Sequence, residues 1–153
     1  SSLMSMPAIP AVPVDAVALG VVVDDWRGAV REAGAALARA EVALPGYADE
    51  MIRMIEENGP YIVIAPGLAL AHARPGRTVL KDGIAVVTLA TPVDFGHPYN
   101  DPVSVVLALA VTTAEAHVAL VAELANVFND STAVADIAAA TSVDEVQRIL
   151  GSA

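Results

Sequence analysis

The chain has 153 residues and no cysteine, which excludes disulfide bonds, thiolate metal sites and thiol nucleophiles. Its 18 acidic residues against 8 Lys and Arg give a net charge of −10, which disfavours nucleic acid and anionic membrane surfaces as partners, because no clustered basic patch is present. The length predicts one domain, and a hydrophobic content of 56% with only 4% aromatic residues predicts the α/β class.

The first thirteen residues are expected to form a flexible arm, and the domain itself is expected over residues 14–151. Ser1 to Leu3 are expected to be residues left from cloning. Three prolines interrupt the early hydrophobic stretch and no basic residue precedes it, so we expect no secretory signal and a cytoplasmic protein. No apolar run approaches the roughly 20 residues of a helical membrane span, so we expect no direct membrane insertion.

A strand and two helices are predicted next. Ala18 to Val23 is a hydrophobic strand that ends at Asp24-Asp25, whose side chains can cap a following helix. Apolar residues at three- and four-residue steps predict that helix over Trp26 to Ala40, with Trp26 as a packing anchor. The same spacing predicts a second helix over Tyr47 to Asn58, between two breaks rich in Pro and Gly.

The stretch YIVIAPGLALAHARP, from Tyr61 to Pro75, contains the first candidate for chemistry. Two apolar runs, Tyr61 to Ile64 and Leu68 to Ala71, are separated by Pro-Gly and predict two strands joined by a tight turn. His72 therefore lies at a strand end, and Arg74 follows two positions later. On this local pattern alone, a hydrogen-bonded histidine at a sheet edge is the favoured interpretation.

The next strand and loop contain the second histidine. Ile84 to Ala90 is an apolar run that predicts a buried central strand. In the loop from Thr91 to Pro102, His97 either contributes to a reactive site or bonds to Asp94 or Asp101 within its turn. A metal site is disfavoured, because the histidines and aspartates lack a tight ligand spacing.

The third histidine follows another strand, Val103 to Val111. Thr112 and Glu115 have the spacing of a capping box, which predicts a helix through Phe128. His117 lies in its first turn, where free N–H groups and the helix dipole favour anions. Taken alone, a solvent-facing helix residue is the simpler interpretation.

Two further helices are predicted near the C-terminus, over Thr132 to Ala140 and from Ser142 to Gly151, and we interpret both as structural. The second helix opens with a capping box of Ser142 and Glu145. No glycine-rich nucleotide loop is present, so a kinase that uses ATP directly is disfavoured, and no cofactor is expected.

Three segments, GPYIVIAPGLALAHARP, FGHPYNDPV and TTAEAHVALVAELANVF, together resemble the IIA component of the sugar phosphotransferase system (PTS). The resemblance is to the mannitol/fructose-type superfamily (EIIA type 2), most closely its ascorbate branch, and covers residues 14–150. It implies a single α/β domain with a mixed β-sheet of about five strands flanked by helices on both faces. It also implies that His72 accepts a phosphoryl group from the carrier protein HPr, as a tele-phosphohistidine, and passes it to a cysteine of the IIB component.

The same resemblance implies roles for other residues. His117 would lie beside His72 and, with Arg74, stabilise the phosphoryl group, while His97 would contribute to the phosphoryl pocket or to partner recognition. Mannitol- and fructose-type relatives usually have an active-site Arg on the segment where this chain offers Arg53. The sequence leaves open whether Arg53 or Arg74 supplies the cationic contact, and Arg74 is the preferred candidate.

The implied partners are HPr, the IIB component and, indirectly, the IIC membrane permease. Leu68 and Leu70 are expected to form a small docking patch, because a relay partner must dissociate quickly. An alternative is a regulatory protein of the same fold, in which phosphorylation of His72 controls binding to a non-transport partner. The sequence leaves open whether the chain is a monomer or a homodimer and which sugar is transported.

Overall fold

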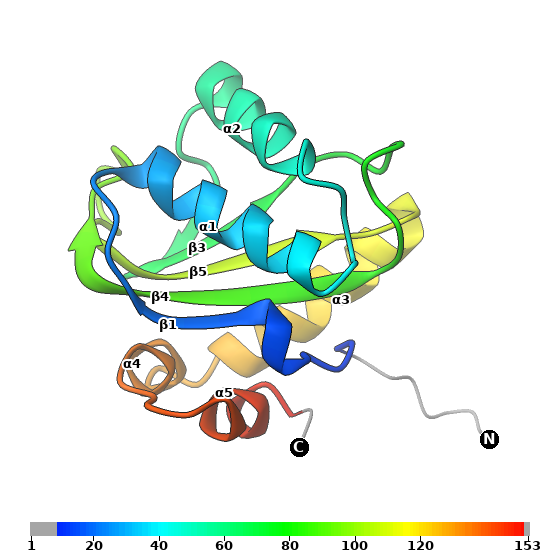
Figure 1. The fold of residues 1–153 in the computed structure, drawn as a ribbon. Coiled ribbons are helices and arrows are strands. Elements are labelled where there is room, and N and C mark those ends of the chain that lie inside the picture. The colour runs from blue at the N-terminus through cyan, green and yellow to red at the C-terminus, as the bar shows by residue number, and fades with distance from the viewer. Residues whose placement is uncertain (1–8, 152–153) are drawn as a thin grey trace.

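A mixed five-stranded sheet is the centre of the structure, a computed structural model that describes residues 9–151 (Figure 1). Across the sheet the strands are β1 (Val17–Val21), β4 (Gly83–Val93), β5 (Val103–Ala110), β3 (Leu68–His72) and β2 (Val63–Ala65). The β1–β4 and β3–β5 pairs are parallel, and the β4–β5 and β2–β3 pairs are antiparallel.

Helices cover both faces of the sheet (Figure 1). On one face lie α1 (Trp26–Arg39) and α2 (Tyr47–Asn58), and on the other lie α3 (Ala114–Phe128), α4 (Ala133–Ala138) and α5 (Val143–Ile149). A short 3₁₀ helix, Val14–Ala16, precedes β1. The predicted α/β class, with a mixed sheet of five strands between two helical layers, is confirmed.

The central strands are apolar because both of their faces are covered. Ile84 to Val87 of β4 and Val105 to Ala110 of β5 are each at most 1% exposed. Burying one Val, Leu or Ile side chain contributes roughly 1.5–3 kcal/mol, so these two strands form much of the core. The loops of the domain emerge at the two ends of these strands.

Strand β1 ends at Val21, two residues before the predicted end. Its register with β4 shifts between Ala18 and Val21, and Gly20 lies there with φ +64°. The N–H of Gly20 donates to the hydroxyl of Thr88, a polar side chain of β4 that is only 2% exposed. This irregularity satisfies a buried hydroxyl and turns the chain toward α1.

The end of β4 and the extent of the N-terminal arm also differ from the prediction. Strand β4 continues to Val93, which pairs with Val103, so the first residues of the predicted loop from Thr91 belong to the strand. At the N-terminus, Val12 is 1% exposed and its carbonyl accepts a hydrogen bond from Gln147 at 2.6 Å. Residues 9–13 therefore lie against the domain, whereas residues 1–8 of the expected arm lie outside the described residues.

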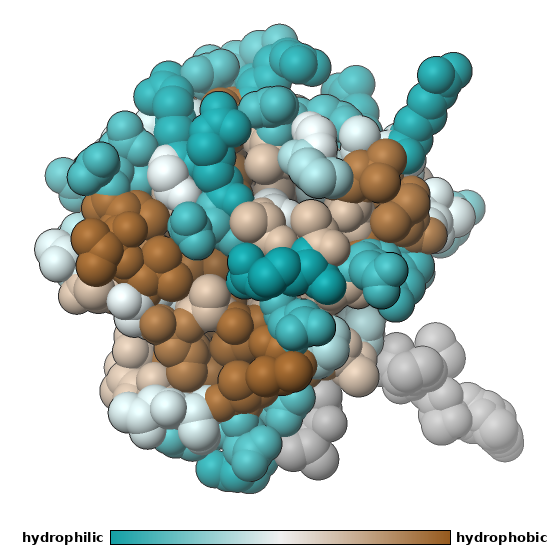
Figure 2. Space-filling view, viewed as in Figure 1, coloured by the Kyte–Doolittle hydropathy of each residue, from teal (hydrophilic) through white to brown (hydrophobic). Residues whose placement is uncertain are grey.

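Helix α2 is held closely against α1. A Cβ atom on Gly34 would lie 2.6 Å from the Cβ of Ala48, so glycine permits this approach. Exposed ion pairs such as Arg31–Asp49, at 3.0 Å, join the outer faces and contribute at most about 1 kcal/mol. In Figure 2 the surface at the top of the view, where α2 lies, is mostly hydrophilic. The close packing places the first residue of α2, Tyr47, inside the core.

Candidate functional site

His72 is the last residue of β3 and pairs with Leu109 of β5. Its Nδ1 atom lies 2.9 Å from the carbonyl oxygen of Leu70. Because a carbonyl oxygen only accepts, Nδ1 has the proton in the neutral ring and Nε2 keeps its lone pair. The ring is half-buried, so Nε2 is the nucleophilic atom that this geometry provides.

The structure brings His117 next to His72. The two ring centroids are 5.0 Å apart and the planes meet at 48°. On another side the ring of Tyr61 meets His72 edge-on, with centroids 5.8 Å apart. The imidazole of His72, at the end of a strand, therefore has close ring neighbours from the start of α3 and from Tyr61, two residues before β2.

The first turn of α3 places His117. Thr113 is its N-cap and accepts a hydrogen bond from the N–H of Ala116 at 3.0 Å. The predicted capping box of Thr112 and Glu115 is wrong, because Thr112 bonds instead to Asp82, through its N–H at 2.7 Å and its hydroxyl at 3.0 Å. Asp82 thereby anchors the turn that leads from β5 into α3.

The surroundings of His72 favour its neutral form. Burial lowers the pKa of His72 below its ordinary value of 6.5, and His117 lowers it further by opposing a second positive charge. The hydrogen bond to Leu70 acts in the opposite direction but is smaller than the effect of burial. His72 is therefore neutral at pH 7 and can act as a nucleophile.

A pocket of about 260 Å³ opens over the two histidines. It is lined by Met54, His72, Ala73, Arg74, Pro75, Ala114, His117 and Val118. Its volume is below the roughly 300 Å³ at which sites for drug-sized ligands begin, so it suits a small group. Arg74 brings a positive charge to walls that are otherwise mostly apolar, which suits a small anion.

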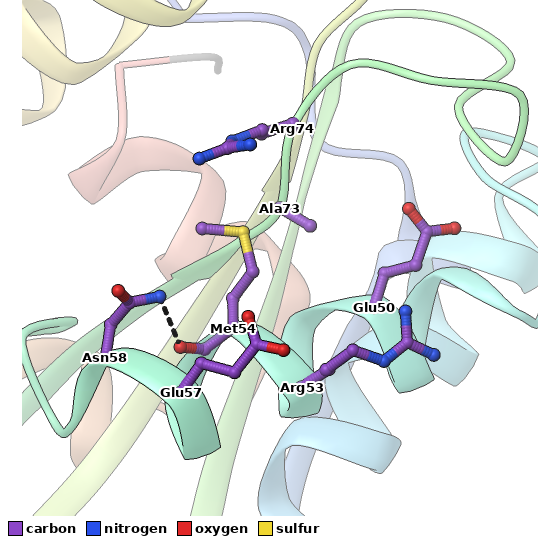
Figure 3. A pocket seen from close by; sticks show the side chains of 7 residues that line it. All are labelled: Glu50, Arg53, Met54, Glu57, Asn58, Ala73 and Arg74. Atoms are coloured by element: carbon purple, nitrogen blue, oxygen red, sulfur yellow. Dashed lines mark hydrogen bonds between the residues drawn. The ribbon is translucent and has the colours of Figure 1, made fainter.

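Arg53 lies in a neighbouring groove of about 210 Å³, not in the histidine pocket. Figure 3 shows Met54 between the two guanidinium groups, with Arg53 directed toward Glu50 and Arg74 pointing away from it. Asn58 donates a hydrogen bond to the carbonyl of Met54 at 2.9 Å. Helix α2 therefore contributes Met54 to the histidine pocket, and Arg74 is the arginine that borders both spaces.

The structure does not bring His97 to this site. The loop that contains His97 joins β4 to β5 and contacts the start of β3, where the N–H of Gly67 donates to the carbonyl of Asn100 at 2.9 Å. His72 is at the other end of β3, roughly 13 Å along the strand. His97 instead organises its own turn. Its Nδ1 accepts from the backbone N–H of Tyr99 at 3.1 Å, and its backbone N–H donates to the carboxylate of Asp101 at 3.0 Å.

Leu68 and Leu70 do not form an exposed patch. They are 0% and 3% exposed, because β3 lies between β5 and β2 with helices on both faces, so the expected docking role is wrong. Exposed apolar side chains near His72 come from elsewhere: Tyr61 is 41% exposed and Val118 is 67% exposed. A partner that reaches His72 would meet these residues.

Tyr47 was not among the residues predicted for the site. Its hydroxyl accepts a hydrogen bond at 2.9 Å from the N–H of Ala73, the residue after His72. One signal in the sequence pointed to its burial, since it precedes Met51 by four residues and so shares the apolar face of α2. Its hydrogen bonds to Ala73 and Leu109, far away in the sequence, had no sequence signal.

Two features are absent from the described residues. Between residues 9 and 151, no helix has the length and apolar character needed to cross a membrane. Across the same part of the chain, no group of three or more His, Asp or Glu side chains is arranged to hold a metal ion.

The fold agrees with a family match. Residues 12–153 match the family described as "Phosphoenolpyruvate-dependent sugar phosphotransferase system, EIIA 2". The chain belongs to this family of PTS IIA components. The ascorbate-specific PTS system EIIA component of Escherichia coli (strain K12) is 38% identical over 108 residues, which cover 70% of this chain and 70% of that protein.

Solved structures show the same fold. A crystal structure described as a PTS IIA domain from Streptococcus pyogenes M1 GAS superimposes with a TM-score of 0.84 at 31% identity, covering 95% of this chain and 96% of that chain. The IIA mannitol protein of Escherichia coli gives a TM-score of 0.79 at 26% identity, covering 91% and 98%. The predicted resemblance to the mannitol-type superfamily and its ascorbate branch is confirmed.

Proposed function

We propose that this protein is a phosphocarrier in which Nε2 of His72 accepts a phosphoryl group from phosphorylated HPr and passes it to a cysteine of a IIB component. In the first step the Nε2–P bond forms as the bond between phosphorus and HPr breaks. In the second step a sulfur–phosphorus bond forms as the Nε2–P bond breaks. The observation that supports this proposal most is the hydrogen bond from Nδ1 to Leu70, which leaves Nε2 as the free nucleophile.

The neighbouring side chains suit this chemistry. Phosphoryl transfer needs an in-line nucleophile and stabilisation of charge on the equatorial oxygens, more than it needs a base. A lowered pKa keeps His72 neutral, so its lone pair is available without a separate base. We assign His117 and Arg74 to the stabilisation of the phosphoryl oxygens, because both line the pocket over His72.

We further propose that the system transports ascorbate or a related sugar or pentitol, and that the reaction takes place in the cytoplasm. The support for the substrate is the ascorbate-specific relative at 38% identity. The sugar itself would bind the IIC permease, which this chain would reach only through IIB. HPr and IIB are therefore its direct partners in this proposal.

The test is a reconstituted relay with phosphoenolpyruvate, enzyme I, HPr and the protein. Wild type should incorporate acid-labile phosphate, and ³¹P–¹⁵N NMR should locate it on Nε2 of His72. His72→Ala should incorporate none, because no other group replaces the attacking nitrogen. Full labelling of His72→Ala would contradict the assignment. Labelled wild type that transfers to no IIB cysteine would favour the regulatory alternative.

A further inference from the structure

Tyr47 places a polar group inside the core, hydrogen-bonded to the residue that follows His72. It is the first residue of α2 and its side chain is 0% exposed. Burial raises the pKa of Tyr47 to about 12, so the hydroxyl is neutral and retains its proton at physiological pH. A buried phenol needs hydrogen-bond partners, since an unsatisfied hydroxyl is costly in the interior.

The hydroxyl has partners on the residue that follows β3 and on β5. Its oxygen accepts the N–H of Ala73 at 2.9 Å, because a backbone amide can only donate. Its proton is directed to the carbonyl oxygen of Leu109 at 2.8 Å, while the carbonyl oxygen of Ala73 is farther away at 3.2 Å. One hydroxyl of α2 thus links the residue after His72 to β5.

This link lies at the point where β3 and β5 separate. Leu109 is the residue of β5 that pairs with His72, the last residue of β3. Beyond that pair the chain leaves the sheet, and the hydroxyl stands between the amide of Ala73, just past β3, and the carbonyl of Leu109 on β5. It joins two backbone groups of buried residues, which need hydrogen-bond partners because water does not reach them.

We propose that Tyr47 is a positioning residue for phosphoryl transfer, whose hydroxyl holds the backbone after His72 at a fixed place against β5. The proposal rests on the function assigned to His72. The imidazole is already tied on its N-terminal side by the bond from Nδ1 to Leu70. On the C-terminal side, the hydroxyl of Tyr47 restrains the backbone of Ala73, where the segment that leads to Arg74 begins.

The hydroxyl and the ring of Tyr47 make separable contributions. The ring fills the core, and phenylalanine would fill it equally well. The hydroxyl contacts neither the pocket nor the solvent, so it cannot touch the phosphoryl group or a partner protein. Its effect on the reaction therefore has to pass through the backbone at Ala73.

The test is Tyr47→Phe, with Tyr99→Phe as the matched control. Tyr99 is 87% exposed and lies in the loop between β4 and β5, at the far end of the strands from His72. We expect Tyr47→Phe to slow phosphoryl uptake at saturating phospho-HPr by about 10- to 100-fold, the usual cost of a misplaced reacting group. The concentration of HPr that gives half the maximal rate should not change, since no partner contact is lost. Tyr99→Phe should match wild type.

A spectroscopic measurement separates positioning from a purely structural role. Long-range ¹H–¹⁵N spectra of His72 should show the single Nδ1–H tautomer in wild type and a mixture of tautomers in Tyr47→Phe. A folded Tyr47→Phe with the wild-type rate and tautomer would overturn the proposal. These spectra use the unphosphorylated protein, so they test Tyr47 even if wild type takes no phosphate, a result that would overturn the proposed function instead.

A second variant covers the case in which Tyr47→Phe does not fold. Incorporation of 3-fluorotyrosine at position 47 keeps the ring packing but makes the hydroxyl a stronger donor and a weaker acceptor. The amide of Ala73 and the ring nitrogens of His72 should then shift together. If His72 does not respond, the hydroxyl has only a structural role and the proposal fails.

Discussion

The imidazole rings of His72 and His117 lie with their centroids 5.0 Å apart, one at the end of a strand and the other in the first turn of a helix. At this distance a positive charge on either ring opposes a charge on the other. The pKa of His72 is lowered mainly by burial and also by this opposition. Phosphorylation on Nε2 would bring negative charge to a ring whose neutral form is favoured by burial and by the neighbouring His117.

Replacing His117 by Gln should raise the pKa of His72 toward 6.5, because the amide keeps a polar side chain but cannot become positive. NMR titration of the Cε1 proton of His72 measures this change. His97→Gln, in the loop beyond the other end of β3, should leave the titration of His72 unchanged. If His117→Gln leaves the pKa of His72 at its wild-type value, His117 makes no contribution and burial alone lowers the pKa.

His117→Ala should still accept phosphate on His72 but transfer it more slowly to IIB. We expect a loss of about 10² to 10³ in rate if the imidazole stabilises charge as an oxyanion-hole donor does. Quenched-flow measurements of labelled phosphate on the protein and on IIB follow the two steps separately. A variant that takes up no phosphate at all would make His117 essential to uptake rather than a stabilising group.

Arg74 and Arg53 should differ in their effect on the reaction. Arg74→Gln removes the guanidinium that lines the histidine pocket and should slow uptake by about 10²-fold. Arg53→Gln is the matched control and should react like wild type, because Arg53 lines only the neighbouring groove. Equal losses in both variants would place the phosphoryl group nearer to α2 than we propose.

The lowered pKa of His72 predicts a dependence of stability on pH. The unfolded chain binds a proton at about 6.5, whereas the folded chain binds it only at lower pH. The stability associated with neutral His72 is therefore fully present above 6.5 and is lost as the pH falls through the folded pKa. In urea unfolding, the free energy of unfolding should fall more between pH 7.5 and pH 5.5 for wild type than for His72→Gln. Equal losses would exclude this linkage.

Local patterns predicted several elements closely. Helix α2 begins and ends at Tyr47 and Asn58 as predicted, because its apolar spacing and the following Gly-Pro act within a few residues. Asp25 caps α1 by accepting from Gly28, and Ser142 caps α5 by accepting from Glu145, both from local spacing. The placement of His72 at a strand end was also readable, since a strand of five residues has a local signature.

The sequence by itself thus determined the class of fold, the extent of most elements and the strand end at which His72 lies, because these depend on hydrogen bonds and side-chain periodicity between near neighbours. Only the tertiary structure decided which histidine meets His72. The parallel pairing of β3 with β5 puts His72 at the end of the strands where α3 begins, and leaves His97 at their opposite end. The burial of Leu70 and the link from Tyr47 to Leu109 depend on the same pairing. Strand order is set by packing between residues far apart in the chain, which no local pattern records.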